Sequence, residues 1–199
     1  MENIHSPPER WRLITIDWID AVGKTTLAKG LSERLSGIYY KTPWKKTKEE
    51  RNHFDRPNIS VQERFNFYSR ALKEDAMEIS ELLKTWKHII CDRFVVSTII
   101  HHKAMDKNVD VGEIEKTGHL PWLIQILLVA TKESILDRLL RREELTRFEK
   151  DEDLMIKSQW LYIKRAFDLV IDTTRFSIEE TLSRTLLLIN NPTNYEKLL

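Results

Sequence analysis

Residues 16–26 read IDWIDAVGKTT, and the second half of this stretch has the sequence of a phosphate-binding loop. An apolar segment, residues 11–16, precedes it and suits a strand, while residues 25–35 have the pattern of a helix. A loop placed between a strand and a helix directs main-chain N–H groups at an anion, and the positive end of the helix strengthens the attraction. The stretch therefore predicts an α/β fold with a phosphate site after its first strand.

The residues of this loop are expected to divide the binding of a nucleoside triphosphate among them. Lys24 would bridge the β- and γ-phosphates, and the hydroxyl of Thr25 would be a ligand of Mg²⁺. Gly23 lets the main chain approach the phosphate, since it has no Cβ atom. ATP and Mg²⁺ are thus the expected cofactors, and the expected nucleotide-binding residues are Asp20, Ala21, Val22, Gly23, Lys24, Thr25 and Thr26.

Trp18 stands where loops of the form G-x-x-x-x-G-K-[ST] have their first glycine. That glycine shapes the exit from the strand and mostly does not touch phosphate, so we expect a functional loop with an altered rim. If the position requires a positive φ, a tryptophan there costs on the order of 1–3 kcal/mol, which a domain stabilised elsewhere tolerates. A vestigial loop that no longer binds nucleotide is the alternative.

Short apolar segments alternate with longer amphipathic ones along the rest of the chain. The pattern predicts further strands at 38–40, 88–91, 122–129 and 169–171, and helices at 95–105, 134–142, 154–167 and 178–189. Residues 60–86 are predicted to form one long helix or two joined helices. The polar segment 41–57 reads as a loop. Strands separated by helices predict a doubly wound parallel five-stranded sheet flanked by helices. No linker is visible, so residues 1–199 are expected to form a single domain with loosely held ends at 1–9 and 190–199.

Composition excludes several classes of protein. Lys and Arg total 32 against 31 Asp and Glu, so the basic excess of a nucleic-acid-binding protein is missing. Cys91 is the single cysteine, which excludes an internal disulfide and fits a reducing compartment. The sequence has no secretion signal and no apolar run long enough to cross a bilayer. These features predict a cytoplasmic protein that binds neither nucleic acid nor membrane.

Four motifs, in the same order along the chain, resemble those of thymidylate kinases. The family loop EGIDGSGKTT, the motif DRY, an arginine-rich lid and the ending VIDASxSxEEV correspond to DWIDAVGKTT, DRF at 92–94, RLLRREELTRFE at 138–149 and VIDTTRFSIEETL at 170–182. The similarity runs from about residue 14 to residue 188. It implies the fold of the P-loop nucleoside monophosphate kinases with a short lid near 141–152, small-molecule nucleotide substrates and a homodimer.

The resemblance also implies roles for individual polar residues. Asp92, after an apolar strand, would help to position Mg²⁺, and Arg93 would hold the acceptor phosphate with its forked guanidinium. Asp20 would approach the acceptor sugar, and Ser97 matches a serine of the second motif. The alternatives are a surface salt bridge for Arg93 and a turn-stabilising role for Asp20.

The lid arginines are the expected source of the cation that neutralises the transferred phosphoryl group. The loop has Ala21 where some thymidylate kinases carry an arginine, and those without it supply the arginine from the lid. Arg142 or Arg147 is therefore expected to be catalytic. The lid also contains Arg138 and Arg141, and a solvated helix face is the alternative for all four.

The acceptor side departs from the family more than the donor side does. Phe67 and Arg70 lie near where the family has a ring that stacks on the base and an arginine that contacts it, but their spacing differs by one residue. A core Phe and a surface Arg are equally compatible. The family segment REPGG is replaced by KTPWKK at 41–46, and a Tyr-Gln pair by His101 and His102, for which we favour polar surface over metal ligands.

The leading functional hypothesis is ATP-dependent phosphorylation of a nucleoside monophosphate, most simply dTMP, with Lys24, Asp92, Arg93, Arg142 and Arg147 in catalysis. A deoxynucleoside kinase, or a relative with an unusual acceptor, is a second hypothesis, and it would need an acid near the acceptor hydroxyl. The third is a GTP-dependent switch or a nucleotide-binding protein without turnover. The segment nearest to the guanine-reading motif [NT]KxD is TKES at 131–134, which lacks the Asp.

Overall fold

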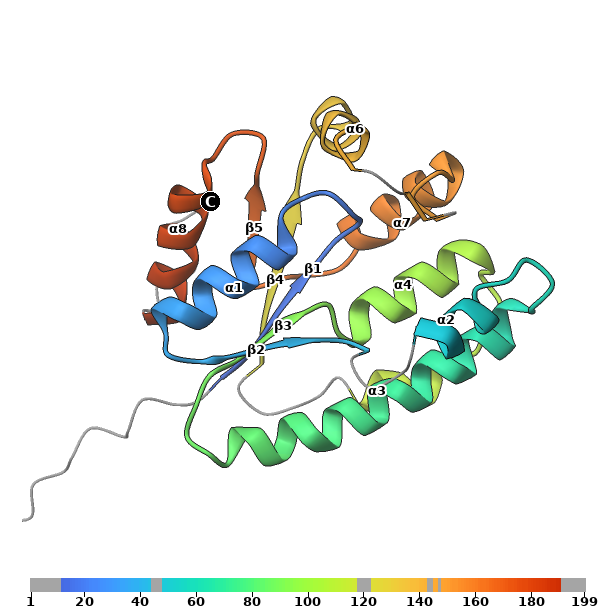
Figure 1. Cartoon of the computed structure of the whole chain (residues 1–199), viewed down its shortest axis with the longest axis horizontal. Helices are drawn as coiled ribbons and strands as arrows, with labels where there is room; N and C mark the ends of the chain where they lie inside the picture. Colours follow the sequence, from blue (N-terminus) through green and yellow to red (C-terminus); the bar gives the residue numbers. More distant parts are fainter. Residues whose placement is uncertain (1–11, 44–47, 118–122, 143–144, 147, 191–199) are drawn as a thin grey trace, which may run out of the picture.

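The computed structural model describes residues 12–43, 48–117, 123–142, 145–146 and 148–190 (Figure 1). Its centre is a sheet of five parallel strands, as the sequence predicts, and the order of the strands is β2-β3-β1-β4-β5. The strands are β1 (Leu13–Asp17), β2 (Ile38–Lys41), β3 (Ile89–Asp92), β4 (Leu123–Val129) and β5 (Leu169–Asp172). The helices are α1 (Lys24–Arg34), α2 (Lys48–Phe54), α3 (Val61–Leu83), α4 (Val95–Met105), α5 (Gly112–Thr117), α6 (Lys132–Leu140), α7 (Glu152–Ile163) and α8 (Ile178–Asn190).

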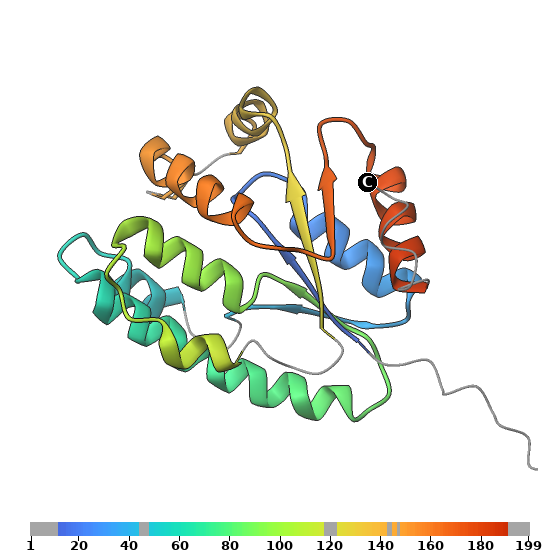
Figure 2. The same cartoon turned by 180° about the vertical axis from the view of Figure 1, so that it is seen from behind.

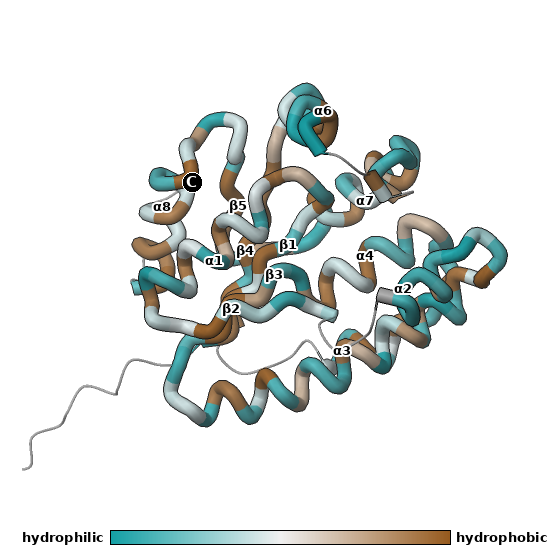
Figure 3. Tube along the Cα trace, viewed as in Figure 1, coloured by the Kyte–Doolittle hydropathy of each residue, from teal (hydrophilic) through white to brown (hydrophobic). Residues whose placement is uncertain are grey.

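Helices cover both faces of the sheet, with α1 and α8 on one side and α3, α4 and α5 on the other (Figures 1 and 2). Two apolar clusters correspond to these layers. Ile14 and Ile90 belong to the cluster with α1 and α8, whereas their neighbours Leu13 and Ile89 belong to the cluster with α3. Successive residues of a strand point to opposite faces, which explains this division. Figure 3 shows the hydrophobic residues of β1 and β3 gathered in the middle of the molecule.

The position of β1 decides where a ligand can bind. β1 pairs with β3 on one side and with β4 on the other, so the chain proceeds outward from it in opposite directions. Ligands of such sheets bind beyond the carboxyl ends of the strands at this point of reversal. The loop after β1 and the end of β3 meet there, because Ile16 is in register with Asp92.

The secondary structure differs from the sequence prediction in a few places. The segment 41–57, predicted to be a loop, contains α2, and α5 was not predicted at all. The long helix predicted near 60–86 is the single helix α3, and Ser60 caps it together with Glu63 in a reciprocal capping box. The terminal segments 1–9 and 191–199 lie outside the described residues. Within the described parts of the chain, every helix is too short or too polar to cross a membrane.

Candidate functional site

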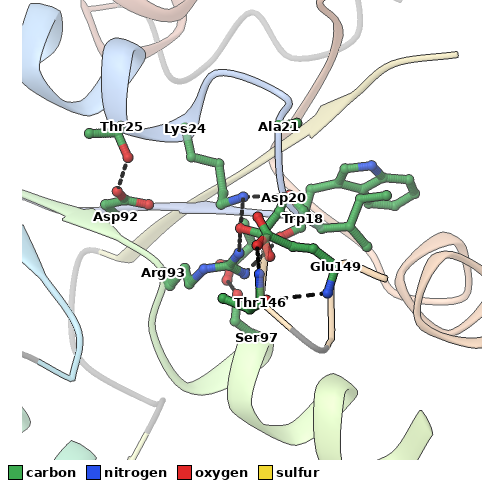
Figure 4. Close-up of polar contacts among 12 residues, drawn as sticks. Trp18, Asp20, Ala21, Lys24, Thr25, Asp92, Arg93, Ser97, Thr146 and Glu149 are labelled. Carbon is green, nitrogen blue, oxygen red and sulfur yellow. Dashed lines mark hydrogen bonds and ion pairs between the residues drawn. The ribbon is translucent and has the colours of Figure 1, made fainter. Parts of the chain in front are cut away.

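The loop after β1 wraps around the side chain of Lys24. Its Nζ donates a hydrogen bond to the main-chain oxygen of Ile19 and lies 3.9 Å from the Asp20 carboxylate. Gly23, at the N-terminus of α1, has a φ of 92° and makes no side-chain cap, so the first N–H groups of the helix have no capping side chain. The loop thus has the geometry of a phosphate-binding site, with its lysine directed inward (Figure 4).

Lys24 is held in an environment that disfavours its charge. Its side chain is only 6% exposed. Burial, followed by the nearby charge of Arg93, lowers the pKa of Lys24 to about 7, although the carboxylates of Asp20, Asp92 and Asp17 act in the opposite direction. An anionic ligand placed beside the ammonium group would favour its protonated form.

Trp18 adopts a φ of 137°. This is the positive φ for which the sequence predicts backbone strain at a tryptophan. The side chain is 3% exposed, and its ring centroid lies 5.1 Å from that of Tyr162 on α7. In Figure 4 the indole points away from Lys24 and Thr25. The indole is therefore part of the apolar core beside the loop and does not occupy the space around Lys24.

Thr25 and Asp92 lie together at the end of β3. The Thr25 hydroxyl donates a 2.5 Å hydrogen bond to Oδ2 of Asp92, and the Tyr39 hydroxyl lies 3.4 Å from the same oxygen. The second oxygen, Oδ1, is buried and has no hydrogen-bond partner among the described residues. Hydroxyl and carboxylate oxygens are ligands that suit Mg²⁺, so this pair fits the metal expected from the sequence.

Arg93 joins the β3 motif to the phosphate loop. Its two terminal nitrogens donate to the main-chain oxygen of Trp18 at 2.9 Å and to the Asp20 carboxylate at 2.5 Å. Burial opposes the ionised form of both partners, but their mutual attraction prevails. It keeps the pKa of Asp20 below its usual range and raises the pKa of Arg93 above its usual range.

Ser97 belongs to a buried hydrogen-bond chain that the sequence only partly indicated. Its hydroxyl donates to Asp17 at 2.5 Å and accepts from the hydroxyl of Tyr162 at 3.0 Å. Burial raises the pKa of Asp17. The family resemblance pointed to Ser97, but no feature of the sequence pointed to Tyr162, which lies 65 residues away and meets Ser97 only through the packing of α4 against α7.

A cavity of about 280 Å³ opens beside Arg93, and we refer to it as the acceptor cavity. Asp20, Arg93 and Ser97 line it, as do the unpredicted residues Tyr68 and Glu149. Phe67 and Arg70 do not line this cavity.

Phe67 and Arg70, which do not line the acceptor cavity, lie elsewhere on α3. Phe67 is buried and stacks on Phe54 of α2 at 4.2 Å, and Arg70 faces solvent. Neither residue therefore lines the acceptor cavity, and their expected contacts with the base stay a prediction. Tyr68, one residue later on α3, faces the cavity and donates to Asp55 at 3.1 Å.

His101 and His102 are also part of the cavity wall, so our interpretation of them as polar surface was wrong. Nδ1 of His102 lies 2.7 Å from the Thr98 carbonyl, which can only accept, so this nitrogen carries the proton. Burial is the main cause that lowers the pKa of His101 to about 3 and that of His102 to about 4. Both rings are neutral at physiological pH. The described residues contain no group of three or more His, Cys, Asp and Glu side chains arranged to hold a metal.

The lid arginines differ in what they contact. Arg142 makes an ion pair with Glu149, whose other carboxylate oxygen accepts the N–H of Thr146 at 2.8 Å. Arg138 donates to the main-chain oxygen of Ala21 at 3.2 Å, whereas Arg141 is exposed and pairs with a neighbour on its own helix. Arg147 lies outside the described residues.

A second cavity, of about 480 Å³, adjoins the other side of the phosphate loop, and we call it the donor cavity. It is built from the loop, two of the lid arginines and the segment that connects β5 to α8. Its lining residues include Ala21, Val22, Gly23, Thr26, Arg138 and Arg142. The two cavities share no lining residue, so the loop around Lys24 lies between them.

Comparison with protein families gives a match that covers most of the chain. The family model described as Thymidylate kinase matches residues 16–183. Curated relatives include a probable thymidylate kinase of Methanococcus aeolicus, 27% identical over 183 residues, covering 85% of this chain and 91% of the relative. Another, from Archaeoglobus fulgidus, is 27% identical over 197 residues and covers 93% of this chain and 98% of the relative.

Solved structures of thymidylate kinases have the same fold as this chain. A thymidylate kinase from Candida albicans aligns over 94% of both chains with a TM-score of 0.76 and 21% identity. One from Ehrlichia chaffeensis aligns over 89% of this chain and 98% of its own, with a TM-score of 0.64 and 19% identity. The predicted fold class is thereby confirmed.

Proposed function

The chain belongs to the thymidylate kinase family and is a nucleotide kinase, and we propose that it transfers the γ-phosphoryl group of ATP to dTMP, forming dTDP and ADP. One observation carries the proposal. The loop around Lys24 separates two cavities, and side chains from distant motifs converge on each of them. Transfer between two nucleotides needs two anions held in line on opposite sides of one cationic centre.

The donor cavity suits ATP. Main-chain N–H groups of residues 21–25 and the ammonium of Lys24 are proposed to bind the β- and γ-phosphates. Thr25 and Asp92 are proposed to hold Mg²⁺, since their oxygens lie together and Oδ1 of Asp92 has no other partner in the described chain. When bound, the metal neutralises charge on the phosphates.

The acceptor cavity suits the monophosphate. Arg93 donates one bond from each terminal nitrogen to the protein, which fixes its guanidinium while other N–H groups stay available for the acceptor phosphate. Asp20 is proposed to lie beside the sugar and Ser97 at the cavity floor. Tyr68, rather than Phe67, is proposed to contact the base, since of these two neighbouring rings on α3 it is the one that lines the cavity.

In the reaction, an oxygen of the acceptor phosphate forms a bond to the γ-phosphorus while the bond from that phosphorus to the β,γ-bridging oxygen breaks. Charge spreads over the moving group, and Lys24 and Arg142 are proposed to neutralise it. Arg142 is suited to this role because it lines the donor cavity and is held by Glu149 from the acceptor side. A role for Arg147 stays a prediction.

A panel of acceptors tests the function. Purified protein with ATP and Mg²⁺ is mixed in turn with dTMP, dUMP, dCMP, dAMP and thymidine, and ADP formation is followed by a coupled assay. We expect the highest kcat/KM with dTMP and no turnover by Lys24→Met, the control for contaminating kinases. Turnover of thymidine alone would identify a deoxynucleoside kinase, and absence of ADP with every acceptor would identify a nucleotide-binding protein without turnover.

Assembly as a homodimer is part of the same proposal, and its support is the resemblance to thymidylate kinases. Light scattering of the purified protein tests it, with a mass near twice the 23.7 kDa of the chain as the expected result.

A further inference from the structure

The segment between β5 and α8 is one residue longer than the family ending that it resembles. The family form reads D-A-S-x-S-x-E-E, whereas this chain reads DTTRFSIEE from Asp172 to Glu180. The longer segment contains an aromatic residue, Phe176. Both this residue and the segment lie beyond the carboxyl end of β5, at the edge of the sheet where the phosphate loop also lies.

Phe176 forms part of the wall of the donor cavity. It also lines a second hollow along β5, which Arg184 lines too. The guanidinium carbon of Arg184 lies 3.9 Å from the centroid of the Phe176 ring. Phe176 therefore has the Arg184 guanidinium over its ring and also lines the donor cavity, which Arg184 does not line.

The position of the phosphates fixes where the rest of the donor nucleotide must lie. With the triphosphate bound at the loop of residues 21–25, the base extends into the remainder of the same cavity of about 480 Å³. Arg138 lines that space, but its guanidinium already donates to Ala21, to the Thr173 hydroxyl at 3.0 Å and to the Thr173 main-chain oxygen at 2.9 Å. Among the described residues that line the donor cavity, Phe176 is the only aromatic one, and an aromatic ring can stack on a purine.

We propose that Phe176 is a binding residue for the donor nucleotide and stacks on its purine base. The inference rests on the donor site assigned under the proposed function and adds a residue to it. Arg184 supports the stack from behind, since a cation over one face holds the ring in place and draws electron density from it. Stacking of a base on an aromatic side chain strengthens binding by roughly 5- to 150-fold.

Replacement of the ring by an aliphatic side chain tests the stack. Phe176→Leu keeps apolar volume but removes the aromatic face. We expect its affinity for a non-hydrolysable ATP analogue with Mg²⁺, measured by calorimetry, to be roughly 5- to 150-fold weaker. Affinity for inorganic tripolyphosphate, which has no base, should be unchanged, and Phe176→Tyr should retain wild-type affinity for the analogue.

Trp160→Leu is the matched control, because Trp160 is an aromatic residue with the Lys164 ammonium 3.1 Å from its ring centroid, but it lies on α7 and does not line the donor cavity. It should bind the analogue as the wild type does. The proposal is overturned if Phe176→Leu changes analogue affinity less than about twofold, or if it weakens tripolyphosphate equally. If the protein phosphorylates dTMP but Phe176→Leu binds the ATP analogue as the wild type does, only the stacking proposal is refuted. If Phe176→Leu weakens binding of the analogue but the wild type does not phosphorylate dTMP, only the proposed function is refuted.

Discussion

The guanidinium of Arg93 lies 2.5 Å from the carboxylate of Asp20, so two motifs that are 73 residues apart in the sequence meet in one ion pair. The same arginine donates to the main-chain oxygen of Trp18 at 2.9 Å. The arginine proposed to hold the acceptor phosphate is thus oriented before the acceptor binds. Such preorganisation lowers the entropic cost of bringing two reactants into line.

Arg93→Lys is expected to lower kcat/KM for dTMP about 10- to 100-fold, because lysine keeps the charge but cannot donate to Trp18, Asp20 and phosphate in the fork that arginine provides. Steady-state kinetics at saturating ATP measure the effect. The control is Arg34→Lys, since Arg34 makes an exposed ion pair with Glu179 at 2.9 Å and lines neither cavity. Equal kcat/KM for Arg93→Lys and the wild type would contradict the role of the fork.

Glu149→Gln is expected to lower kcat about tenfold, because a neutral amide holds Arg142 less firmly than a carboxylate does. The KM for dTMP should change little, since the effect acts through the lid arginine. Glu152→Gln serves as the control, because Glu152 pairs with Lys132 at 3.1 Å on the exposed surface. A larger change in KM than in kcat would indicate instead that Glu149 contacts the acceptor directly.

Trp18→Gly removes both backbone strain and buried surface, and the two effects oppose each other. Relief of the positive φ stabilises by about 1–3 kcal/mol, whereas loss of a buried indole destabilises by about 3–5 kcal/mol. We therefore expect the free energy of unfolding to fall by about 2 kcal/mol, as measured by chemical denaturation. Trp86 is a matched control because its φ is also positive, 66°, but its side chain is 64% exposed.

Trp86→Gly should accordingly leave stability unchanged or raise it by up to about 1 kcal/mol, because it relieves strain and removes little buried surface. An equal loss of stability in Trp18→Gly and Trp86→Gly would contradict the prediction that burial of the Trp18 indole contributes more to stability than its backbone strain costs.

Binding of ATP is expected to take up a proton at Lys24. Burial, followed by the charge of Arg93, lowers the pKa of Lys24 to about 7 in the free protein, and a triphosphate beside it must raise that pKa. The affinity for ATP is therefore highest below pH 7, where Lys24 is already protonated in the free protein. Above pH 7 it falls by up to about tenfold per pH unit, until the pH reaches the pKa of Lys24 in the bound state.

Calorimetry with an ATP analogue at pH 8, in buffers of different ionisation enthalpy, counts the protons taken up. Lys24→Arg is the control, since arginine stays protonated throughout this range. A proton count of zero for the wild type would refute the prediction.

Asp92→Asn is expected to raise the Mg²⁺ concentration for half-maximal activity at least about tenfold, because it removes a negative oxygen from the proposed metal site. Magnesium titration of the kinase activity measures this. Asp137→Asn is the surface control, since Asp137 pairs with Arg141 on the exposed face of α6. A parallel loss of activity at every Mg²⁺ concentration would place Asp92 in a role that does not involve the metal.

The sequence predicted most of the fold because the relevant signals are local. A strand, the GKTT loop and a helix follow each other within residues 11–35, and each is favoured by its own residues. The alternation of strands and helices then leaves few arrangements other than a parallel sheet covered on both faces. The missed helix α2 is short, and the polar residues and prolines around it hid its pattern.

Tertiary structure alone decided which side chains reach the cavities. Periodicity shows that α3 is a helix, but not that Tyr68 instead of Phe67 faces the acceptor, because neighbouring helical residues point about 100° apart and the phase depends on packing against α2 and α4. The same reason applies to the neutral His101 and His102 and to Trp18 beside Tyr162. Their burial and pKa values arise from partners distant in sequence, which become neighbours only when the helices pack.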